Sequence, residues 1–593
     1  MEQLASPSKT ITTSPSATPQ PPVRAQSQTG AQIIIRSLIK QGVEVVFGYP
    51  GGQAIDIYDE LYKHSDQIKH VLTAHEQGAA HAADGYARAT GKVGVAIATS
   101  GPGATNLVTG IATAHLDSIP LVAITGNVGT ALLGKDSFQE TDIFGITIPV
   151  TKHNYIVKDI NDLPRIMAEA FLVAKSDRPG PVLIDVPKDV QTASLMCVLP
   201  EPFDKDDEKD QSAGSEYVTY TQEELQQAAD IIAASERPYI YSGGGVLTAD
   251  AGAEVAAFAD YLDAPIACSI MGLTAIPFSH PRNLGMTGMH GHESAIRAQD
   301  RTDLIIAIGA RFSDRATGNK AHYVSGKKFI HIDIDPAEMN KNITVDVPLV
   351  GNIKEVLGKL TALLPPTKRP EWQQEIAVMR KEELEHIPTT QRLEARKIIK
   401  AVRDRTTDDT LIVTDVGQHQ MWVAQSYPFE KPRTFLTSGG LGTMGFGMGA
   451  AIGACMGNGY AKGTGPQKTV LFTGDGSFGM NLTELATAVT QNLPLVIVIM
   501  NNGVLGMVRQ WQSLFFDERH SNTTLQRATD FPAVAKAFGA DGQRVHNLDE
   551  LEAALDTAFA AEGPYVVECV IEENDKVFPM IPPGGTVKDM LLG

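Results

Sequence analysis

The chain lacks several features that would assign it to a class of protein directly. Its 593 residues include only 4 cysteines and no CxxC pair, which excludes a cysteine zinc site and a disulfide-rich framework and is typical of a reducing compartment. No apolar run reaches the roughly 18 residues that a membrane span requires. With 50 basic and 69 acidic side chains the formal net charge is -19. This charge argues against a nucleic-acid or membrane partner, because both attract a basic surface.

The N-terminal segment also lacks the apolar core of a secretory signal. Residues 1–26 are rich in Ser, Thr and Pro, so they cannot bury enough apolar surface to become ordered. We expect this segment to be a disordered tail and the protein to be cytoplasmic, or organellar if the tail is a presequence.

The rest of the chain alternates short apolar runs, such as "VGVAIATS" and "LPLVIVIM", with helix-like segments. Such runs are typical of parallel strands buried on both faces, so the sequence predicts an α/β fold with three doubly wound parallel-sheet domains. An acidic linker and a charged, exposed helix are expected between them. The predicted domains cover residues 27–195, 218–365 and 396–572, the linkers residues 196–217 and 366–395, and a C-terminal arm residues 573–593.

The first and third domains share an internal pattern. Residues 99–127 and 472–502 both contain a strand, a G-x-G turn, Asn-Leu, an alanine-rich helix, a Pro-Leu-Val strand and a final Asn. Convergence on one common βαβ unit is an alternative, but a duplicated domain is the better explanation. Only the second copy has an acid in the turn, because Pro102 stands where Asp475 does, so the two copies are expected to have different roles.

The turn "GDG" and the later pair "NN" indicate a ligand site. If the strands before them are parallel neighbours, Asp475 and Asn502 emerge at one edge of the sheet, where open α/β sheets bind ligands. A carboxylate, an amide oxygen and a loop carbonyl suit Mg²⁺, and the glycines let the backbone approach a diphosphate. The alternative is a turn without a ligand. The spacing of 27 positions between Asp475 and Asn502 makes the pattern more specific than a lone GDG.

These residues resemble the thiamine-diphosphate enzymes. Within them the chain is similar to the acetohydroxyacid synthases, also called acetolactate synthases, over nearly its whole length from about residue 27. The resemblance is carried by stretches such as "HEQGAAHAADGYARATGK", "SGPGATNL", "GARFSDR", "SGGLGTMGFG" and "NNGVLGMVRQWQ". It implies a pyrimidine-binding first domain, a central FAD-binding domain and a diphosphate-binding third domain.

The resemblance also implies which residues hold thiamine diphosphate and Mg²⁺. The metal ligands would be Asp475, Asn502 and the carbonyl of Val504. The residues at the cofactor would be Glu76, Gln418, His419, Gly442, Thr443, Met444, Asp475, Gly476, Ser477, Asn502, Leu505, Gly506 and Met507.

Glu76 is implied as the catalytic acid of this site. A carboxylate bonded to the aminopyrimidine ring can exchange a proton with it, and the cofactor carries the rest of the chemistry. The alternative is that Glu76 only stabilises the start of the next helix. Met444 resembles the bulky residue that bends the cofactor; a Met in such a segment is otherwise core filler.

The central block distinguishes relatives within the superfamily, because its motifs resemble those of flavin-containing members. The residues implied at FAD are Arg178, Gly245, Ser269, Ile270, Thr287, Gly288, Met289, His290, Gly309, Arg311, Asp333, Ile334, Asn352 and Ile353. Ser313 departs from the aspartate that relatives often have at this position.

A second ketoacid needs a fixed cation for its carboxylate, and Arg315 is the family candidate because a guanidinium can bind a carboxylate through two bonds. Its alternative is a surface ion pair with Asp314. The resemblance adds Phe138, Gln139, Lys188 and Trp511 as walls of the substrate channel; a Trp on such a helix is by default core. The segment "VFPMIPPGG" (577–585) is expected to fold over the site.

The implied activity is the condensation of pyruvate with a second 2-ketoacid, pyruvate or 2-ketobutyrate, in branched-chain amino-acid biosynthesis. Its cofactors would be thiamine diphosphate, Mg²⁺ and FAD, and its partners a second or further copies of the chain and a small regulatory subunit. The alternatives are pyruvate oxidase, glyoxylate carboligase and a non-catalytic nucleotide-binding protein. Glu76 disfavours the carboligase, whose family lacks this glutamate.

Overall fold

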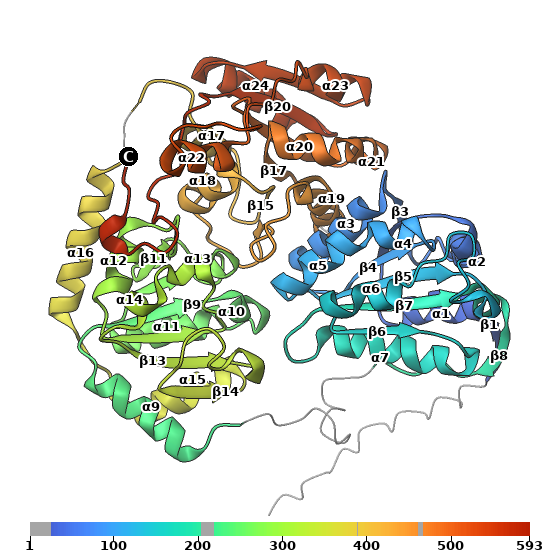
Figure 1. Cartoon of the computed structure of the whole chain (residues 1–593), viewed down its shortest axis with the longest axis horizontal. Helices are drawn as coiled ribbons and strands as arrows, with labels where there is room; N and C mark the ends of the chain where they lie inside the picture. The colour runs from blue at the N-terminus through green and yellow to red at the C-terminus, as the bar shows by residue number, and fades with distance from the viewer. Residues whose placement is uncertain (1–24, 203–218, 388–389, 461–466) are drawn as a thin grey trace, which may run out of the picture.

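The computed structural model describes residues 25–202, 219–387, 390–460 and 467–593. Three parallel sheets of six strands each form three α/β domains (Figure 1). In Figure 1 the first domain is blue, the central domain green and the third domain orange and red. No helix among these residues is long and apolar enough to cross a membrane.

The first domain has the strand order β3-β2-β4-β5-β7-β6. Its strands are β2 (Val45–Tyr49), β3 (Lys69–Leu72), β4 (Gly94–Ala98), β5 (Leu121–Asn127), β6 (His153–Ile156) and β7 (Pro181–Pro187). Its helices are α1 (Gly30–Lys40), α2 (Ile55–Lys63), α3 (Glu76–Thr90), α4 (Pro102–Asn106), α5 (Val108–Asp117), α6 (Ile143–Thr147), α7 (Leu163–Lys175) and α8 (Lys188–Thr192).

The third domain has the strand order β16-β15-β17-β18-β20-β19. Its strands are β15 (Leu411–Thr414), β16 (Phe435–Leu436), β17 (Thr469–Gly474), β18 (Leu495–Asn501), β19 (Asp541–Val545) and β20 (Tyr565–Val570). Its helices are α17 (Ala395–Arg403), α18 (Gln418–Ser426), α19 (Phe446–Tyr460), α20 (Asp475–Asn481), α21 (Leu485–Thr490), α22 (Gly506–Phe515), α23 (Phe531–Ala537) and α24 (Leu548–Ala560).

The first and third sheets have the same topology when their strands are numbered in chain order. Helix α4, which begins at Pro102, follows β4 after a short turn, and α20, which begins at Asp475, follows β17 directly. The repeat in the sequence therefore corresponds to two domains of one architecture.

The central domain has the order β11-β10-β9-β12-β13-β14, the doubly wound order of dinucleotide-binding folds. Its strands are β9 (Pro238–Ser242), β10 (Ile266–Cys268), β11 (Asn283–Met286), β12 (Leu304–Ile308), β13 (Lys328–Asp333) and β14 (Val347–Val350). Its helices are α9 (Gln222–Ala234), α10 (Gly244–Thr248), α11 (Gly252–Leu262), α12 (Glu293–Arg301), α13 (Asp314–Thr317), α14 (Lys320–Val324), α15 (Ile353–Leu363) and α16 (Pro370–Glu385).

Several predicted boundaries need correction. Gln26 lies in β1 (Gln26–Thr29), which pairs antiparallel with β8 (Ser194–Cys197), so this ribbon extends the first domain beyond both limits, 27 and 195. The helix expected to be exposed in 366–395 is α16, and its Trp372 is buried in the core of the central domain and donates a hydrogen bond to Pro238 O. The charged composition of α16 made this apolar face difficult to recognise in the sequence. Residues 1–24 and 203–218 of the predicted tail and linker lie outside the described residues.

Helices α3 and α19 join the first domain to the third. Both are rich in Gly and Ala, which permits close contact: a Cβ at Gly453 would lie 1.9 Å from Ala82 O, and one at Gly85 would lie 2.2 Å from Ala450 O. The backbones of the two helices therefore touch along their length, in contact that larger side chains would prevent.

A buried ion cluster lies beside this helix pair. The Arg88 guanidinium on α3 is paired with the carboxylates of Asp84 and of Asp117 at the end of α5, and it donates a hydrogen bond of 2.8 Å to Thr437 O of the third domain. Asp117 in turn accepts hydrogen bonds from Gly439 N and Gly440 N. The cluster thus fixes the loop that follows β16 against the first domain.

Replacing Arg88 with leucine should destabilise the protein strongly. It would leave two carboxylates buried without their cation, and breaking a buried pair costs about 3–5 kcal/mol. Lys92→Ala, which removes an exposed pair with Glu44, should cost about 0–1 kcal/mol. Denaturant unfolding measures both; an Arg88→Leu chain as stable as the Lys92→Ala chain would contradict this account of the interface.

Candidate active site

The carboxyl ends of β17 and β18 bring the GDG turn and the NN pair together. The strands are parallel neighbours with Gly474 opposite Met500, so Asp475 and Asn502 follow at the same edge of the sheet. Val504 pairs with Thr524 in an isolated bridge just beyond. The register therefore confirms the adjacency on which the predicted metal ligand set depends.

Gln418 connects this edge to the neighbouring strand β15. Its Oε1 accepts a hydrogen bond of 3.1 Å from Asn502 Nδ2, and its Nε2 donates to Gln510 Oε1 and Asp575 O. A Cβ at Gly506 would lie 1.9 Å from Gln418 Oε1. Three segments predicted for one cofactor thus lie in contact.

The donors at this edge fit a diphosphate and a magnesium ion. Burial raises the pKa of Asp475 to about 6 and lowers that of His419 to about 3. The His419 Nε2 atom is buried and has no hydrogen-bond partner, so it is available to a ligand. Among the described residues, no group of three or more His, Cys, Asp and Glu side chains is arranged so that it could hold a metal ion. One carboxylate, one amide and one carbonyl leave coordination positions for the phosphate oxygens and water that Mg²⁺ prefers.

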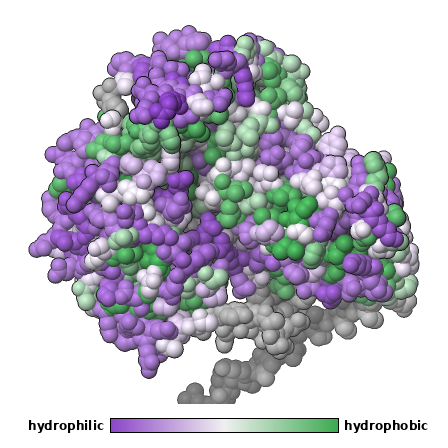
Figure 2. All heavy atoms as spheres, viewed as in Figure 1, coloured by the Kyte–Doolittle hydropathy of each residue, from purple (hydrophilic) through white to green (hydrophobic). Residues whose placement is uncertain are grey.

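A cavity of about 1920 Å³ lies next to this edge and reaches the central domain, and Figure 2 shows a hollow between the domains. Gly417 and Met507 line it, whereas Gln418, Asp475 and Asn502 do not. Its size exceeds the roughly 300–1,000 Å³ of a site for one small ligand. From the third domain Gly442, Met444 and Met507 reach it. The residues predicted for FAD that line it are Arg178, Gly245, Ser269, Ile270, Thr287, Met289, His290, Gly309, Arg311, Asp333, Ile334, Asn352 and Ile353.

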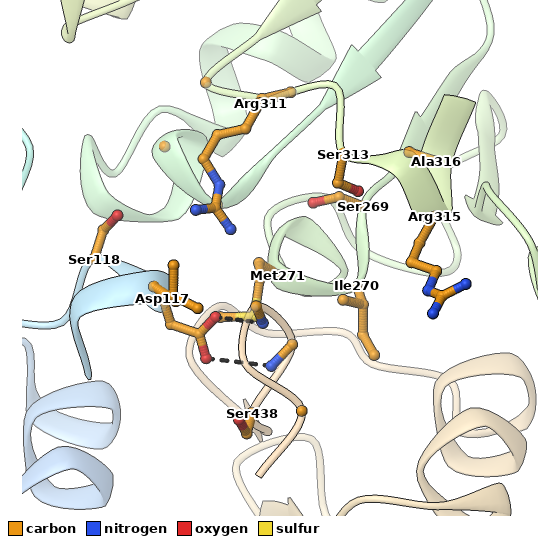
Figure 3. Close-up of a pocket in the computed structure, with 18 of the residues that line it drawn as sticks. Asp117, Ser118, Ser269, Ile270, Met271, Arg311, Ser313, Arg315, Ala316 and Ser438 are labelled. Atoms are coloured by element: carbon orange, nitrogen blue, oxygen red, sulfur yellow. Dashed lines mark hydrogen bonds between the residues drawn. The ribbon is translucent and has the colours of Figure 1, made fainter. Parts of the chain in front are cut away.

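The central-domain wall of the cavity has features of a dinucleotide site. Gly245 and Gly309 approach each other so closely that a Cβ on Gly245 would lie 2.7 Å from Gly309 Cα. Asp333, whose pKa burial raises to about 6, ends β13. Figure 3 shows Arg311 pointing into the space near Ser118, and its guanidinium has no ion-pair or hydrogen-bond partner among the described residues. A free cation in a cavity of this size fits a phosphate.

Gly288, unlike the other residues predicted at FAD, does not line the large cavity. It has a φ of 108° and lies against the backbone of Arg315, beside a second cavity of about 130 Å³ under the C-terminal arm. Its role is to allow that close approach. The arm contacts the same region, because Ile581 N donates to Met289 O.

Arg315 and Trp511 meet at the opening of the large cavity. The Arg315 guanidinium lies over the Trp511 ring at 5.6 Å, while its ion pair with Asp314 is long, at 3.9 Å. Met444 lies further in, and a Cβ at Gly476 would be 3.8 Å from its Cε. The predicted substrate cation, aromatic wall and Met444 therefore line one cavity.

Sequence reasoning placed Arg178 of the first domain at this site but missed other residues that the same domain supplies to the wall. Asp117 and Ser118 line the cavity (Figure 3), and Ser118 Oγ accepts a hydrogen bond of 2.8 Å from Arg178 Nε. Arg178 also pairs with Asp335 and Glu338 of the central domain. Nothing in the local sequence identifies these two residues, because only interdomain packing brings them here.

Glu76 and three predicted channel residues form a separate group on the first domain. Glu76 is the first residue of α3, and its Oε2 accepts a hydrogen bond of 2.9 Å from Asn106 Nδ2. Lys188 pairs with Asp56 at 2.5 Å. Phe138 is 86% exposed and Gln139 adjoins Gly101, and none of these residues lines the large cavity. Within one chain, the implied catalytic acid is thus outside the cavity that Met444, Arg315 and most of the residues predicted for FAD line.

Comparison with known proteins agrees with this architecture. Profiles described as the N-terminal TPP binding, central and C-terminal TPP binding domains of thiamine pyrophosphate enzymes match residues 28–146, 225–360 and 415–569. The chain belongs to the thiamine pyrophosphate enzyme family.

Within this family the chain groups with acetolactate synthase large subunits. It is 47% identical over 564 residues to the isozyme 2 large subunit of Escherichia coli strain K12, covering 95% of this chain and 99% of that protein. It is 45% identical over 579 residues to the large subunit of Corynebacterium glutamicum, covering 95% and 90%. A probable large subunit of Methanocaldococcus jannaschii is 42% identical over 575 residues, with 95% of both chains covered.

Because the Arg311 guanidinium is unpaired in the described part of the chain, we predict that its removal weakens the binding of a flavin dinucleotide. Arg311→Ala should lower the affinity for FAD by about tenfold to a hundredfold, because hydrogen bonds to charged groups contribute about 1.5–3 kcal/mol. Titration with FAD, followed by flavin fluorescence, measures this. Arg301→Ala, on the exposed face of α12 beside Glu375, should bind as the parent does; equal losses in both variants would exclude a specific phosphate contact.

Proposed function

We propose that this protein is an acetolactate synthase that uses thiamine diphosphate, Mg²⁺ and FAD. Two molecules of pyruvate would give 2-acetolactate and CO₂, and with 2-ketobutyrate as acceptor the product would be 2-aceto-2-hydroxybutyrate. This is the first common step in the synthesis of valine, leucine and isoleucine. The relatives are named acetolactate synthase large subunits, and no comparison supports pyruvate oxidase or a non-catalytic protein.

One observation carries the proposal: the GDG and NN edge adjoins a cavity large enough for a dinucleotide. Met444 lines that cavity together with Arg315, and a Cβ at Gly476 would lie 3.8 Å from Met444 Cε. Asp475, Asn502 and the carbonyl of Val504 would hold the metal, and Gln418 and His419 the diphosphate. When bound, the cofactor supplies an acidic carbon and an electron sink for decarboxylation. Met444 would pack against the cofactor, and Arg315 would orient the carboxylate of the acceptor.

Glu76 would exchange a proton with the aminopyrimidine ring through its Oε1, since Oε2 is bonded to Asn106. For this to happen a second chain must bring its first domain to the cavity. The exposed Phe138, and Ile146 and Ile148 on and beside α6, support such an interface; Figure 2 shows apolar atoms gathered around α5 and α6. Exposed apolar patches mark interaction sites.

The proposed assembly is therefore a homodimer, or a tetramer made of two such dimers, and each dimer has two shared sites related by a two-fold axis. The designation of the relatives as large subunits supports a small regulatory subunit as a further partner. We propose a cytoplasmic location because the relatives include bacterial enzymes and no described helix could span a membrane.

Product analysis tests the activity directly. Pyruvate incubated with the chain, Mg²⁺, thiamine diphosphate and FAD should yield 2-acetolactate and CO₂. Glu76→Gln should keep the fold and cofactor affinity but lose about 10²-fold or more of the turnover, as expected when a general acid–base group is removed. Acetyl phosphate as product, or a Glu76→Gln chain with parental turnover, would overturn the assignment.

Mixed dimers test whether the site is shared. Glu76→Gln and Asp475→Ala chains, each nearly inactive, are unfolded together and refolded as a mixture. About half of random dimers pair unlike chains, and each has one site with both defects and one with neither, so about a quarter of parental activity should return. If mixed dimers form and the mixture stays inactive, the site lies within one chain.

A further inference from the structure

Glu484 is a buried carboxylate with no part in the proposed chemistry, and it lies against the backbone that leads to Glu76. It follows α20 in a short 3₁₀ turn, Leu482–Glu484, and its side chain is fully buried. His75 N donates to its Oε1 at 3.0 Å and Ala74 N donates to its Oε2 at 3.2 Å. A carboxylate of the third domain thus binds the two residues directly before the implied catalytic acid.

The surroundings of Glu484 hold its carboxylate in this position. Thr487 Oγ1 donates a third hydrogen bond to Oε2, at 2.8 Å. On the other side, a Cβ at Gly78 would lie 1.9 Å from Glu484 Oε1, so the first turn of α3 fits around the carboxylate only because residue 78 has no side chain. Burial of a charge is costly unless it is fully hydrogen-bonded, and here backbone amides and a hydroxyl supply the donors.

The contact fixes the direction in which α3 begins. His75 is the N-cap of α3, and its side chain accepts a hydrogen bond from Gln77 N. Because Glu484 binds the amides of Ala74 and His75, it determines where the cap lies and therefore where the Glu76 side chain starts. Asn106 then fixes one carboxylate oxygen of Glu76.

We propose that Glu484 is a positioning residue for Glu76, through which the third domain of each chain sets the catalytic acid that its own first domain presents. The proposal rests on the proposed function, in which Glu76 serves a cavity formed by another chain. The turn that begins at Asp475 and the residue that aligns Glu76 then belong to one continuous segment, 475–484. Each chain would thus connect the metal end of one site to the acid of the other.

Glu484→Gln tests this with little change in shape. The amide keeps one acceptor oxygen but turns an NH₂ group toward a backbone N–H, so one of the two bonds to the segment is lost. Thr487→Val is a milder variant, which loosens the carboxylate without adding a group. The matched control is Glu60→Gln, since Glu60 is also buried but, within the described part of the chain, its carboxylate forms ion pairs only with Lys63 and His64.

The first measurement is amide hydrogen exchange at residues 74 and 75 in the cofactor-free full chain, by mass spectrometry. Glu484→Gln should raise these rates about tenfold, which corresponds to the loss of one ordinary hydrogen bond. Thr487→Val should raise them less and Glu60→Gln should leave them unchanged. Parental rates in both test variants would overturn the proposal, and if Glu484→Gln fails to fold, Thr487→Val decides.

The second measurement is the rate at which the hydrogen on the thiazolium carbon of bound thiamine diphosphate exchanges with deuterated water. Glu484→Gln should slow it about tenfold to a hundredfold, the expected effect of misplacing a catalytic group by about 1 Å, with cofactor affinity unchanged. Faster amide exchange without this slowing would make Glu484 a domain anchor only and overturn the proposal. If Glu76→Gln itself leaves the hydrogen's exchange unchanged, the proposed function fails instead.

Discussion

The close packing of α3 against α19 is the contact on which the site depends. It is possible because both helices are rich in glycine and alanine, so that their backbones touch at Gly85 and Gly453. Beside this helix contact, side chains of each domain form hydrogen bonds with backbone amides of the other domain. Asp117 of the first domain binds the amides of Gly439 and Gly440, in the loop that leads to Met444. Glu484 of the third domain binds the amides before Glu76.

These contacts explain how one chain can carry two parts of a site although the two parts are not adjacent in that chain. The cavity receives residues from all three domains. Arg178 of the first domain, which donates a hydrogen bond to Ser118, joins this domain to the central one through ion pairs with Asp335 and Glu338. Glu76 and Phe138, by contrast, lie on a surface outside that cavity. A rigid joint between domains keeps both parts in fixed relation, so a symmetric second copy could complete both at once.

Local pattern was informative wherever one strand and its neighbour decide the geometry. Asp475 and Asn502 could be placed at one edge because parallel strands with a short crossover must end together, and the register of β17 with β18 agrees. Pro102 and Asp475 occupy equivalent positions in the sequence repeat, and this repeat likewise corresponds to two sheets with the same topology. Most of the central-domain residues that the resemblance implies at FAD share one cavity wall. Gly288 lies instead against the backbone of Arg315, and its place at FAD stays a prediction. For α16 the charged face obscured a stripe of three buried side chains, Trp372, Ile376 and Met379.

The sequence by itself determined the three α/β domains, the duplicated pattern and the ligand edge of the third sheet. All of these follow from periodicity and from residues close together along the chain. Only the tertiary structure decided that Asp117 and Ser118 line the cavity, that Glu484 binds the segment before Glu76, and that Glu76 itself lies outside the cavity. These contacts join residues up to 410 positions apart. These residues meet because the helix surfaces of different domains fit together, and no local sequence pattern contains that information.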